Sequence, residues 1–220
     1  VRELIIVGGW RAGKYTLLAA IIFSRMFRYY MKQQPGLFWL VAANYNLARQ
    51  EFIYIRTWAR IMGMIDGVVI EPQQGSWVLT CRYGIILQTI SAEHEETIAS
   101  VAPDMIGVPE AGQCSDLTRM FIQGRALEKD AMIVYAGTLE DSTEHAQWAW
   151  YLELATQWLD GGVCEGVSTG EFEHDCSIEH NAYSLPSWVN LAVFPDGEQD
   201  EKIQRRKQNL FSATGSNHAF

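Results

Sequence analysis

The sequence of 220 residues has few cysteines, no long apolar run and no excess of basic residues. No run approaches the roughly 18 apolar residues that cross a bilayer, so we expect no transmembrane helix and no membrane partner. The apolar N-terminal run meets Gly8 without a basic leader, so we expect no signal peptide. The four cysteines include no C-x-x-C pair, which is typical of reduced thiols in a cytoplasm.

Basic residues are in the minority, with 17 Lys and Arg against 26 Asp and Glu and a formal net charge of −9. The overall field of the protein therefore does not attract DNA, and a nucleic-acid partner would need a local basic stripe. Hydrophobic residues make up 48% and charged residues 20% of the chain, which is an ordinary globular composition. A chain of this length can bury the core of one α/β domain with an appendage.

Short apolar runs alternate with segments of helical periodicity up to about residue 145. Leu4–Val7 is entirely apolar and is followed by glycine, as expected of a parallel strand buried on both faces. This alternation predicts an α/β fold, with a mainly parallel sheet and helices on both of its faces. Helices are expected at 16–32, 46–62 and 116–127, and further strands at Leu37–Ala42, Gly67–Ile70, Ser76–Cys81, Ile85–Ile90, Met105–Val108 and, as the last core strand, Ala131–Ala136.

The first expected helix has two different faces. Arg25, Arg28 and Lys32 fall three and four residues apart, so they share one face. Four apolar side chains of the same helix are expected to point inward: Leu17, Leu18, Ile21 and Ile22.

The composition changes after about residue 145, where an aromatic-rich helix is expected at Gln147–Trp158 and a polar, acidic stretch follows. We interpret residues 146–220 as a lid and linker region attached to a core at 1–145. The helix carries four aromatic side chains that we expect to pack the lid on the core rather than to stack on bases: Trp148, Trp150, Tyr151 and Trp158.

Two polar clusters in this region also allow a functional interpretation. Arg205-Arg206-Lys207 could contact DNA phosphates or a neighbouring subunit, but a charge run of this kind favours a solvated helix face. A second set could hold zinc but lacks the short paired spacings of zinc sites, which favours an acid-rich loop: Cys164, His174, Cys176 and His180.

The segment Gly8–Lys14 matches the pattern G-x-x-x-x-G-K, between a buried strand and an amphipathic helix. Such a loop wraps a phosphate with backbone N–H groups, and the helix N-terminus adds favourable partial charge. Lys14 would reach the β- and γ-phosphates of ATP. The alternative is a glycine-rich turn that only joins strand to helix. The predicted ATP-binding residues are Gly8, Gly9, Trp10, Arg11, Ala12, Gly13, Lys14, Tyr15 and Thr16.

The residue after Gly13-Lys14 departs from the pattern. A Ser or Thr there supplies a hydroxyl to Mg²⁺, and this chain has Tyr15. A phenol on a rigid ring does not place its oxygen where a serine hydroxyl lies. Thr16 could serve as the metal ligand only if the loop is shifted by one residue.

A carboxylate is expected at the end of a second core strand, where a P-loop ATPase holds its catalytic base. Met105–Val108 is followed by Pro109-Glu110-Ala111 where Asp-Glu-Ala is usual. Glu110 can act as the catalytic base, and Pro109 cannot bind a metal. The alternative for Glu110 is a solvated acid at a strand end.

The order of these motifs resembles the ATPase region of large terminase subunits of tailed phages. That family carries a P-loop, a W-L-V-A-P-x-Y-x-x-A-R segment, a Walker B strand and an S-G-T coupling motif. Here the corresponding segments are Gly8–Thr16, Trp39–Arg49, Met105–Ala111 and Ala136-Gly137-Thr138, followed by similar stretches at Leu185–Asn190 and Phe194–Gly197.

The resemblance implies an additional-strand P-loop ATPase that uses ATP and Mg²⁺ to drive double-stranded DNA into a procapsid. It implies a homo-oligomeric ring, commonly a pentamer, in the host cytoplasm and transiently docked on the portal protein, with the small terminase subunit as a further partner. Catalytic roles would fall to Lys14, Glu110 and Arg11, the last at the γ-phosphate. Gly137 and Thr138 would couple the nucleotide to movement.

Full-length members of that family continue into a nuclease domain, which we do not expect within these residues. Two other functions stay open. The chain could be a nucleotide-binding ring subunit with weak or no hydrolysis, because Tyr15 and Pro109 remove both expected protein contacts to the Mg²⁺ shell. It could also be a helicase-like translocase on single strands. Arg11, in turn, could simply pair with a surface acid.

Overall fold

The computed structural model describes residues 2–9, 11–92, 101–138, 150–151, 153–155, 180–205 and 207. Eight described strands form one sheet in the order β3-β4-β5-β2-β6-β7-β1-β8. The strands are β1 Glu3–Gly8, β2 Gly36–Ala42, β3 Ile65–Ile70, β4 Val78–Cys81, β5 Ile85–Ser91, β6 Met105–Val108, β7 Met132–Gly137 and β8 His180–Leu185. The long helices are α1 Lys14–Met31, α2 Tyr45–Ile61 and α4 Asp116–Leu127.

The sheet is mainly parallel, as predicted. β2 runs parallel to β5 and β6, and β7 runs parallel to β6 and β1. Among the described strands, antiparallel pairing is confined to β4, which lies next to the edge strand β3 and runs antiparallel to both β3 and β5. Strand β7 lies between β1 and β6, so one strand separates the phosphate-loop strand from the strand that leads to Glu110. This is the additional-strand arrangement.

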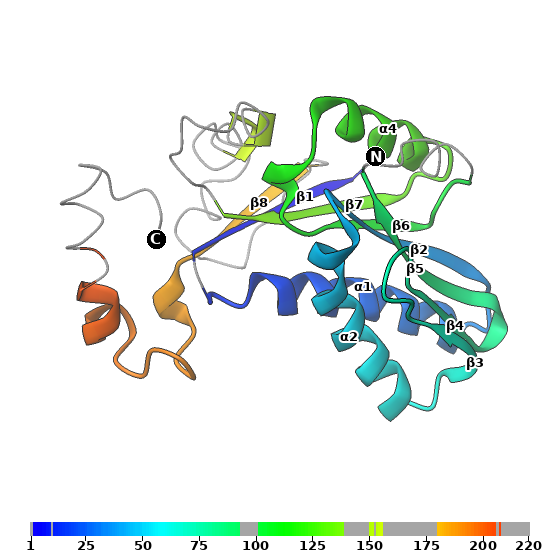
Figure 1. Cartoon of the computed structure of the whole chain (residues 1–220), viewed down its shortest axis with the longest axis horizontal. Helices are drawn as coiled ribbons and strands as arrows, with labels where there is room; N and C mark the ends of the chain where they lie inside the picture. Colours follow the sequence, from blue (N-terminus) through cyan, green and yellow to red (C-terminus); the bar gives the residue numbers. More distant parts are fainter. Residues whose placement is uncertain are drawn as a thin grey trace.

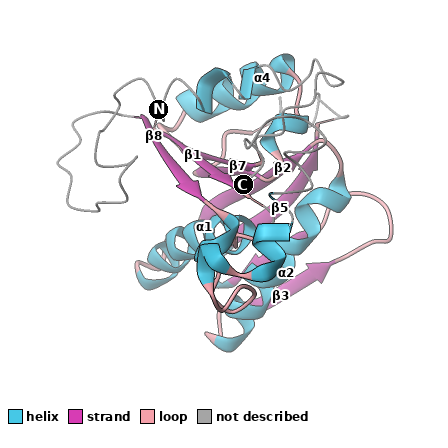
Figure 2. Cartoon of the chain, turned by 90° about the vertical axis from the view of Figure 1, so that its left-hand side faces the viewer, coloured by secondary structure: helices cyan, strands magenta, loops and turns pink. Residues whose placement is uncertain are grey.

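Helices cover both faces of the sheet, with α1 and α2 on one side and α4 on the other (Figures 1 and 2). Alternation along β1 explains both contacts, because successive side chains of a strand point to opposite faces. Leu4 and Ile6 belong to the core under α1 and α2, whereas Ile5 and Val7 belong to the core under α4. A strand buried on both faces needs the continuous apolar sequence that β1 has.

Helix α1 buries a narrower stripe than its sequence predicted. Leu18 and Ile22 are fully buried, but Leu17 is 38% exposed and Ile21 is only partly buried. At about 100° per residue, the stripe that faces the sheet follows positions 18, 22 and 26, and Leu17 falls beside it. Met26 continues the buried stripe. The expectation that all four apolar residues point inward was therefore wrong for Leu17.

Strand β8 was not expected, because Ala131–Ala136 was predicted to be the last core strand. β8 pairs in parallel with β1 along the whole length of β1, from Glu3 opposite His180 to Gly8 opposite Leu185. A polar sequence suffices here because β8 is an edge strand of the sheet. Residues 139–149 lie outside the described part of the chain, so the domain boundary at 145 stays a prediction.

Helical residues at 150–151 and 153–155 pack on the α4 side of the sheet. Trp150 and Tyr151 are 5% and 1% exposed, which makes them core residues and not a base-stacking surface. The indole of Trp150 donates to the carbonyl of Cys114 at 2.8 Å, and the ring stacks edge-on against Tyr135. Trp148, Trp158 and three of the residues weighed as zinc ligands, Cys164, His174 and Cys176, lie outside the described residues.

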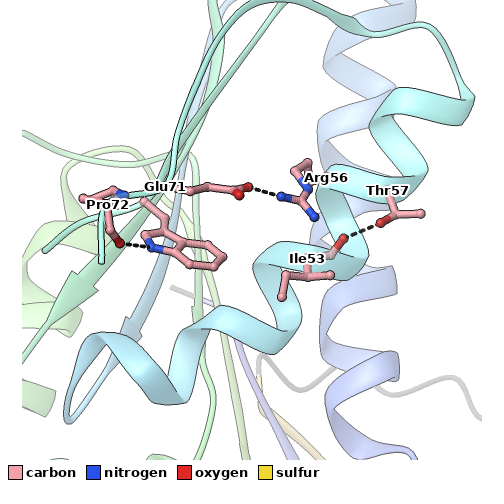
Figure 3. Close-up of polar contacts among 6 residues, drawn as sticks. Ile53, Arg56, Thr57, Glu71 and Pro72 are labelled. Atoms are coloured by element: carbon pink, nitrogen blue, oxygen red, sulfur yellow. Dashed lines mark hydrogen bonds and ion pairs between the residues drawn. The ribbon is translucent and has the colours of Figure 1, made fainter. Parts of the chain in front are cut away.

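Helix α2 begins with a capped turn and is fastened to the β3–β4 end of the sheet. The Asn44 side chain accepts hydrogen bonds from the backbone N–H groups of residues 46 and 47. Further along the helix, Arg56 pairs with Glu71, which follows β3 (Figure 3). Arg49 donates to the carbonyl of Gln73 at 2.6 Å and lies over the Trp77 ring. Arg49 therefore holds the β3–β4 hairpin beside α2.

No helix in the described ranges is both long enough and apolar enough to cross a bilayer.

Close packing of α1 on β6 depends on Gly107. A Cβ added there would clash with Cδ1 of Ile22 and lie 3.3 Å from Cδ1 of Leu18. We expect Gly107→Val to lower the free energy of unfolding by about 1–3 kcal/mol, because overpacking forces side chains from their rotamers. The matched control is Gly124→Ala on α4, where an added Cβ meets nothing within 4 Å. Alanine has a higher helix propensity than glycine, so this control should raise the free energy of unfolding, measured in urea, by about 0.5–1 kcal/mol. Equal stability of the two variants would contradict this packing.

Candidate functional site

The predicted phosphate loop lies at the carboxyl edge of the parallel strands, between the end of β1 at Gly8 and the start of α1 at Lys14. Arg11 and Gly13 adopt left-handed backbone angles, with φ of 57° and 90°. Glycine accepts this conformation without strain, which explains the residue at position 13. Trp10 lies outside the described residues.

Strand β8 and the segment after it hold the loop in place. The N–H of Gly9 donates to the carbonyl of Leu185 at 3.0 Å. The side chain of Asn190 donates to the carbonyl of Arg11 at 2.6 Å. A Cβ at Gly8 would lie 3.3 Å from the Leu185 carbonyl oxygen and 3.2 Å from Cδ of Lys14, so a larger residue would crowd both. The terminase-like stretch at Leu185–Asn190 thus contacts the phosphate loop directly.

The N-terminus of α1 is open to an anion. Its cap residue, Gly13, offers no side-chain hydrogen bond, and the first turn contains no acidic residue. The Gly13 carbonyl accepts the first helical bond, from the N–H of Leu17. The backbone N–H groups of the preceding residues have no acceptor within the helix, and the helix dipole favours negative charge beside them. This geometry suits a phosphate group.

Tyr15 brings the two principal predicted residues together. Its ring lies 4.5 Å from the Nζ of Lys14, in the geometry of a cation–π contact. Its hydroxyl donates a hydrogen bond to Oε1 of Glu110. Lys14 is only 5% exposed, and Glu110 is partly buried at the end of β6. Residues 95 positions apart in the sequence therefore lie side by side in the fold.

Glu110 is oriented by an unusual backbone. It has a φ of 46° and ψ of 49°, which a non-glycine residue adopts only when its surroundings hold it there. The short helical turn Ala111–Gln113 follows at once and is buried at Ala111. The turn directs the Glu110 side chain toward the N-terminus of α1, where Tyr15 lies.

The side chains present do not fit a protein-held Mg²⁺. Thr16 is exposed, and two helical positions after the buried Lys14 its side chain is rotated by about 200° away from it. Pro109 has no side-chain atom that could bind a metal ion. The carboxylate of Glu110 already accepts a hydrogen bond from the Tyr15 hydroxyl. Among the described residues, no group of three His, Cys, Asp or Glu side chains could hold a metal ion. The placement of Thr16 thus speaks against the shifted-loop ligand.

The predicted coupling residues lie beside the site. Gly137 ends β7 and is buried, and a Cβ there would be 3.0 Å from the Tyr151 ring. Tyr151 in turn donates to the carbonyl of Ile6 on β1 at 3.2 Å. Glycine at 137 is thus required by packing, and Thr138 follows it at the same edge. Arg11 is exposed and forms no ion pair with any described residue, so the surface pair considered for it is not seen there.

Glu51 is a residue that the sequence interpretation missed. It lies on α2 and is 1% exposed, and its Oε2 has no hydrogen-bond partner among the described residues. Burial raises the pKa of the Glu51 carboxyl from 4.5 to about 7, although a backbone hydrogen bond and the charge of Lys14 lower it. The available signal was an acid beside the apolar stripe of Ala48, Phe52 and Ile55.

The strand order and the phosphate loop define the additional-strand class of P-loop NTPase folds. The sequence itself matches no protein-family model and no curated protein. Solved structures to which the chain is similar include ATPase domains of phage large terminases. The ATPase domain from Thermus phage P74-26 has a TM-score of 0.65 and 11% identity, and the match covers 99% of this chain and 86% of that one.

Two further structures, of phage large terminases, show the same likeness. That of the HK97 bacteriophage has a TM-score of 0.57 and 15% identity, over 98% of this chain and 44% of that one. That of a thermophilic bacteriophage, solved in complex with ADP, has a TM-score of 0.60 and 12% identity, over 95% and 44%. The chain spans less than half the length of these two proteins. At such identities the comparison establishes the fold.

We expect Glu51→Gln to stabilise the protein at pH 8 and not at pH 5. The folded-state pKa of Glu51 lies above its unfolded value, so the folded protein favours the protonated carboxyl. Stability from this group is therefore present below pH 4.5 and is lost as the pH rises to about 7. The neutral amide avoids that loss, and the gain at pH 8 should be about 1–3 kcal/mol.

The measurement is urea unfolding of parent and variant from pH 5 to pH 8. The control, Glu128→Gln, replaces an acid whose side chain is 49% exposed and should show no comparable gain at pH 8. If the difference in free energy of unfolding between the parent and Glu51→Gln does not change with pH, the burial argument is refuted.

Proposed function

We propose that this chain is the ATPase motor subunit of a large terminase, which hydrolyses ATP to move double-stranded DNA into a procapsid. The observation that supports this most directly is the meeting of Lys14 and Glu110 at Tyr15, at the open N-terminus of α1. A cationic side chain, backbone N–H groups and a carboxylate at one strand edge are the parts that phosphoryl transfer to water requires. The terminase-like fold supports the choice of motor.

In the proposed reaction, the loop and the first turn of α1 hold the phosphates of ATP, and the Lys14 ammonium offsets the charge of the transferred group. Glu110 takes a proton from water while the water oxygen attacks the γ-phosphorus. The bond to the bridging oxygen breaks, which yields ADP and phosphate. For this step the Glu110 carboxylate must exchange the phenol of Tyr15 for the attacking water.

Hydrolysis should depend on Lys14 and Glu110. We expect Lys14→Ala and Glu110→Gln each to lower phosphate release by about 10²-fold or more, since positioned charge and general-base catalysis each contribute at that level. The assay follows phosphate release with and without Mg²⁺, and thermal unfolding verifies that each variant is folded. Lys129→Ala, far from the loop, serves as the matched control. If both site variants hydrolyse ATP like the parent, the site assignment fails.

A nucleotide-binding ring subunit with weak or no hydrolysis is the second candidate, favoured by the Tyr15 contact. The phenol both fills the place of the metal-binding hydroxyl and caps the proposed base. Under this alternative the chain binds ATP, and binding is lost in Lys14→Ala, but phosphate release stays near background.

Restoring the usual residues separates these two candidates. We expect Tyr15→Ser together with Pro109→Asp to raise turnover by at least about tenfold, because the pair supplies the hydroxyl and carboxylate that hold Mg²⁺. Tyr15→Phe tests the hydroxyl alone, because it removes the hydrogen bond to Glu110 and keeps the aromatic ring beside Lys14. Turnover that rises in neither variant would favour a differently built site.

The partners of the proposed motor are those that the resemblance to large terminases implies. They are duplex DNA, the portal protein and the small terminase subunit, around a homo-oligomeric ring with five copies in the host cytoplasm that docks transiently on the procapsid. Gly137 and Thr138 would transmit the nucleotide state through β7. Stimulation of hydrolysis by duplex DNA but not by single strands would distinguish packaging from a helicase-like activity.

A further inference from the structure

A second concave site lies on the opposite edge of the sheet from the phosphate loop. It is a cavity of about 590 Å³ between the later turns of α1 and the starts of β1, β6 and β7. Met105 and Met132 are the first residues of β6 and β7, and Arg2 directly precedes β1. The site is thus at the amino edge of the strands, roughly 20 Å along α1 from Lys14 at 1.5 Å per residue.

The walls of this cavity are cationic. Arg2, Arg25 and Arg28 line it together with one acid, Asp130, so the lining carries three positive charges and one negative charge. Arg25 and Arg28 project from the same face of α1, as their spacing predicted, and Arg25 also lies over the Tyr29 ring at 5.6 Å. This cluster is the local basic stripe that a chain with a net charge of −9 needs to attract an anion.

These three guanidinium groups are not neutralised within the part of the chain that the structure describes. None of them forms an ion pair there, and the neighbouring Asp104 accepts from the N–H of Leu37 at 2.8 Å and lies 3.4 Å from Lys129. The basic run near the C-terminus differs. Its described members, Arg205 and Lys207, pair with Glu201 and Glu198 at 2.6 Å and 2.8 Å.

We propose that this cavity binds phosphate groups. Arginine presents N–H donors in a planar fork that matches the oxygens of a phosphate, and three such groups line this cavity. Ile21, Met105 and Met132 give the cavity an apolar wall that excludes water from one side of a bound group. The phosphate can belong to a DNA backbone or to a small phosphate ligand. Phosphate binding stands on the cavity alone, and only DNA as its source rests on the proposed function.

Two titrations with the full chain test the site. In the first, fluorescence anisotropy follows binding of a labelled DNA duplex across a salt series. We expect Arg25→Gln together with Arg28→Gln to weaken binding by roughly tenfold and to reduce the slope of log K against log salt by about 1.8, or about 0.9 for each lost phosphate contact. In the second, calorimetry follows inorganic phosphate in a Lys14→Ala background, which suppresses binding at the phosphate loop.

The matched control is Arg60→Gln together with Arg205→Gln, which removes the same charge from exposed helical positions elsewhere. A further variant, Asp130→Asn, should tighten phosphate binding about twofold or more, because it removes the one negative charge from the lining. Asn also tolerates the left-handed backbone at this position, where φ is 51°.

Loss of duplex binding in the double variant, with the reduced salt slope, assigns the cavity to DNA backbone phosphates. Loss of inorganic phosphate binding alone assigns it to a small ligand. If the double variant matches its control in both titrations, the proposal is overturned. Lys14→Ala should abolish hydrolysis and leave duplex binding intact, so failure of the proposed ATPase and failure of this site are distinguishable.

Discussion

Strand β1 lies between β7 and β8 and is buried on both faces, so the loop that follows it has little freedom to move. The loop is then held a second time, by the Gly9 bond to Leu185 and by the Asn190 bond to Arg11. These contacts leave the N-terminus of α1 facing the end of β6. Parallel strands end at the same edge of a sheet, so the segment after β6 places Glu110 at the same edge as the phosphate loop after β1.

Helix α1 carries both proposed sites, one at each end. Its first residue, Lys14, is buried against Tyr15 and near the acid of Glu51, and its later turns present Arg25 and Arg28. Between the two sites, the helix packs closely on the sheet because Gly107 of β6 has no side chain to hold it away. Burial raises the pKa of the Glu51 carboxyl on α2 to about 7, so this acid contributes less to the stability of the fold above that pH.

The architecture could be predicted well from local sequence patterns. The two errors of that prediction, at Leu17 and at β8, share one cause. Apolar runs identified seven strands and three helices, and the G-x-x-x-x-G-K pattern located the loop, because each depends on neighbouring residues alone. Leu17 was misplaced because the orientation of α1 on the sheet selects which apolar positions are buried. Strand β8 was missed because its polar sequence forms a strand only by pairing with β1.

The sequence by itself determined the order of strand, phosphate loop and helix, the presence of a carboxylate at a second strand end, and the shared face of Arg25 and Arg28. Each of these follows from spacing along one element. Tertiary structure alone decided that Tyr15 touches both Lys14 and Glu110, that Glu51 is buried near that lysine, and that Arg2 completes a basic cavity with α1. Such contacts join residues far apart in the chain, and no local period encodes which distant side chain will lie opposite.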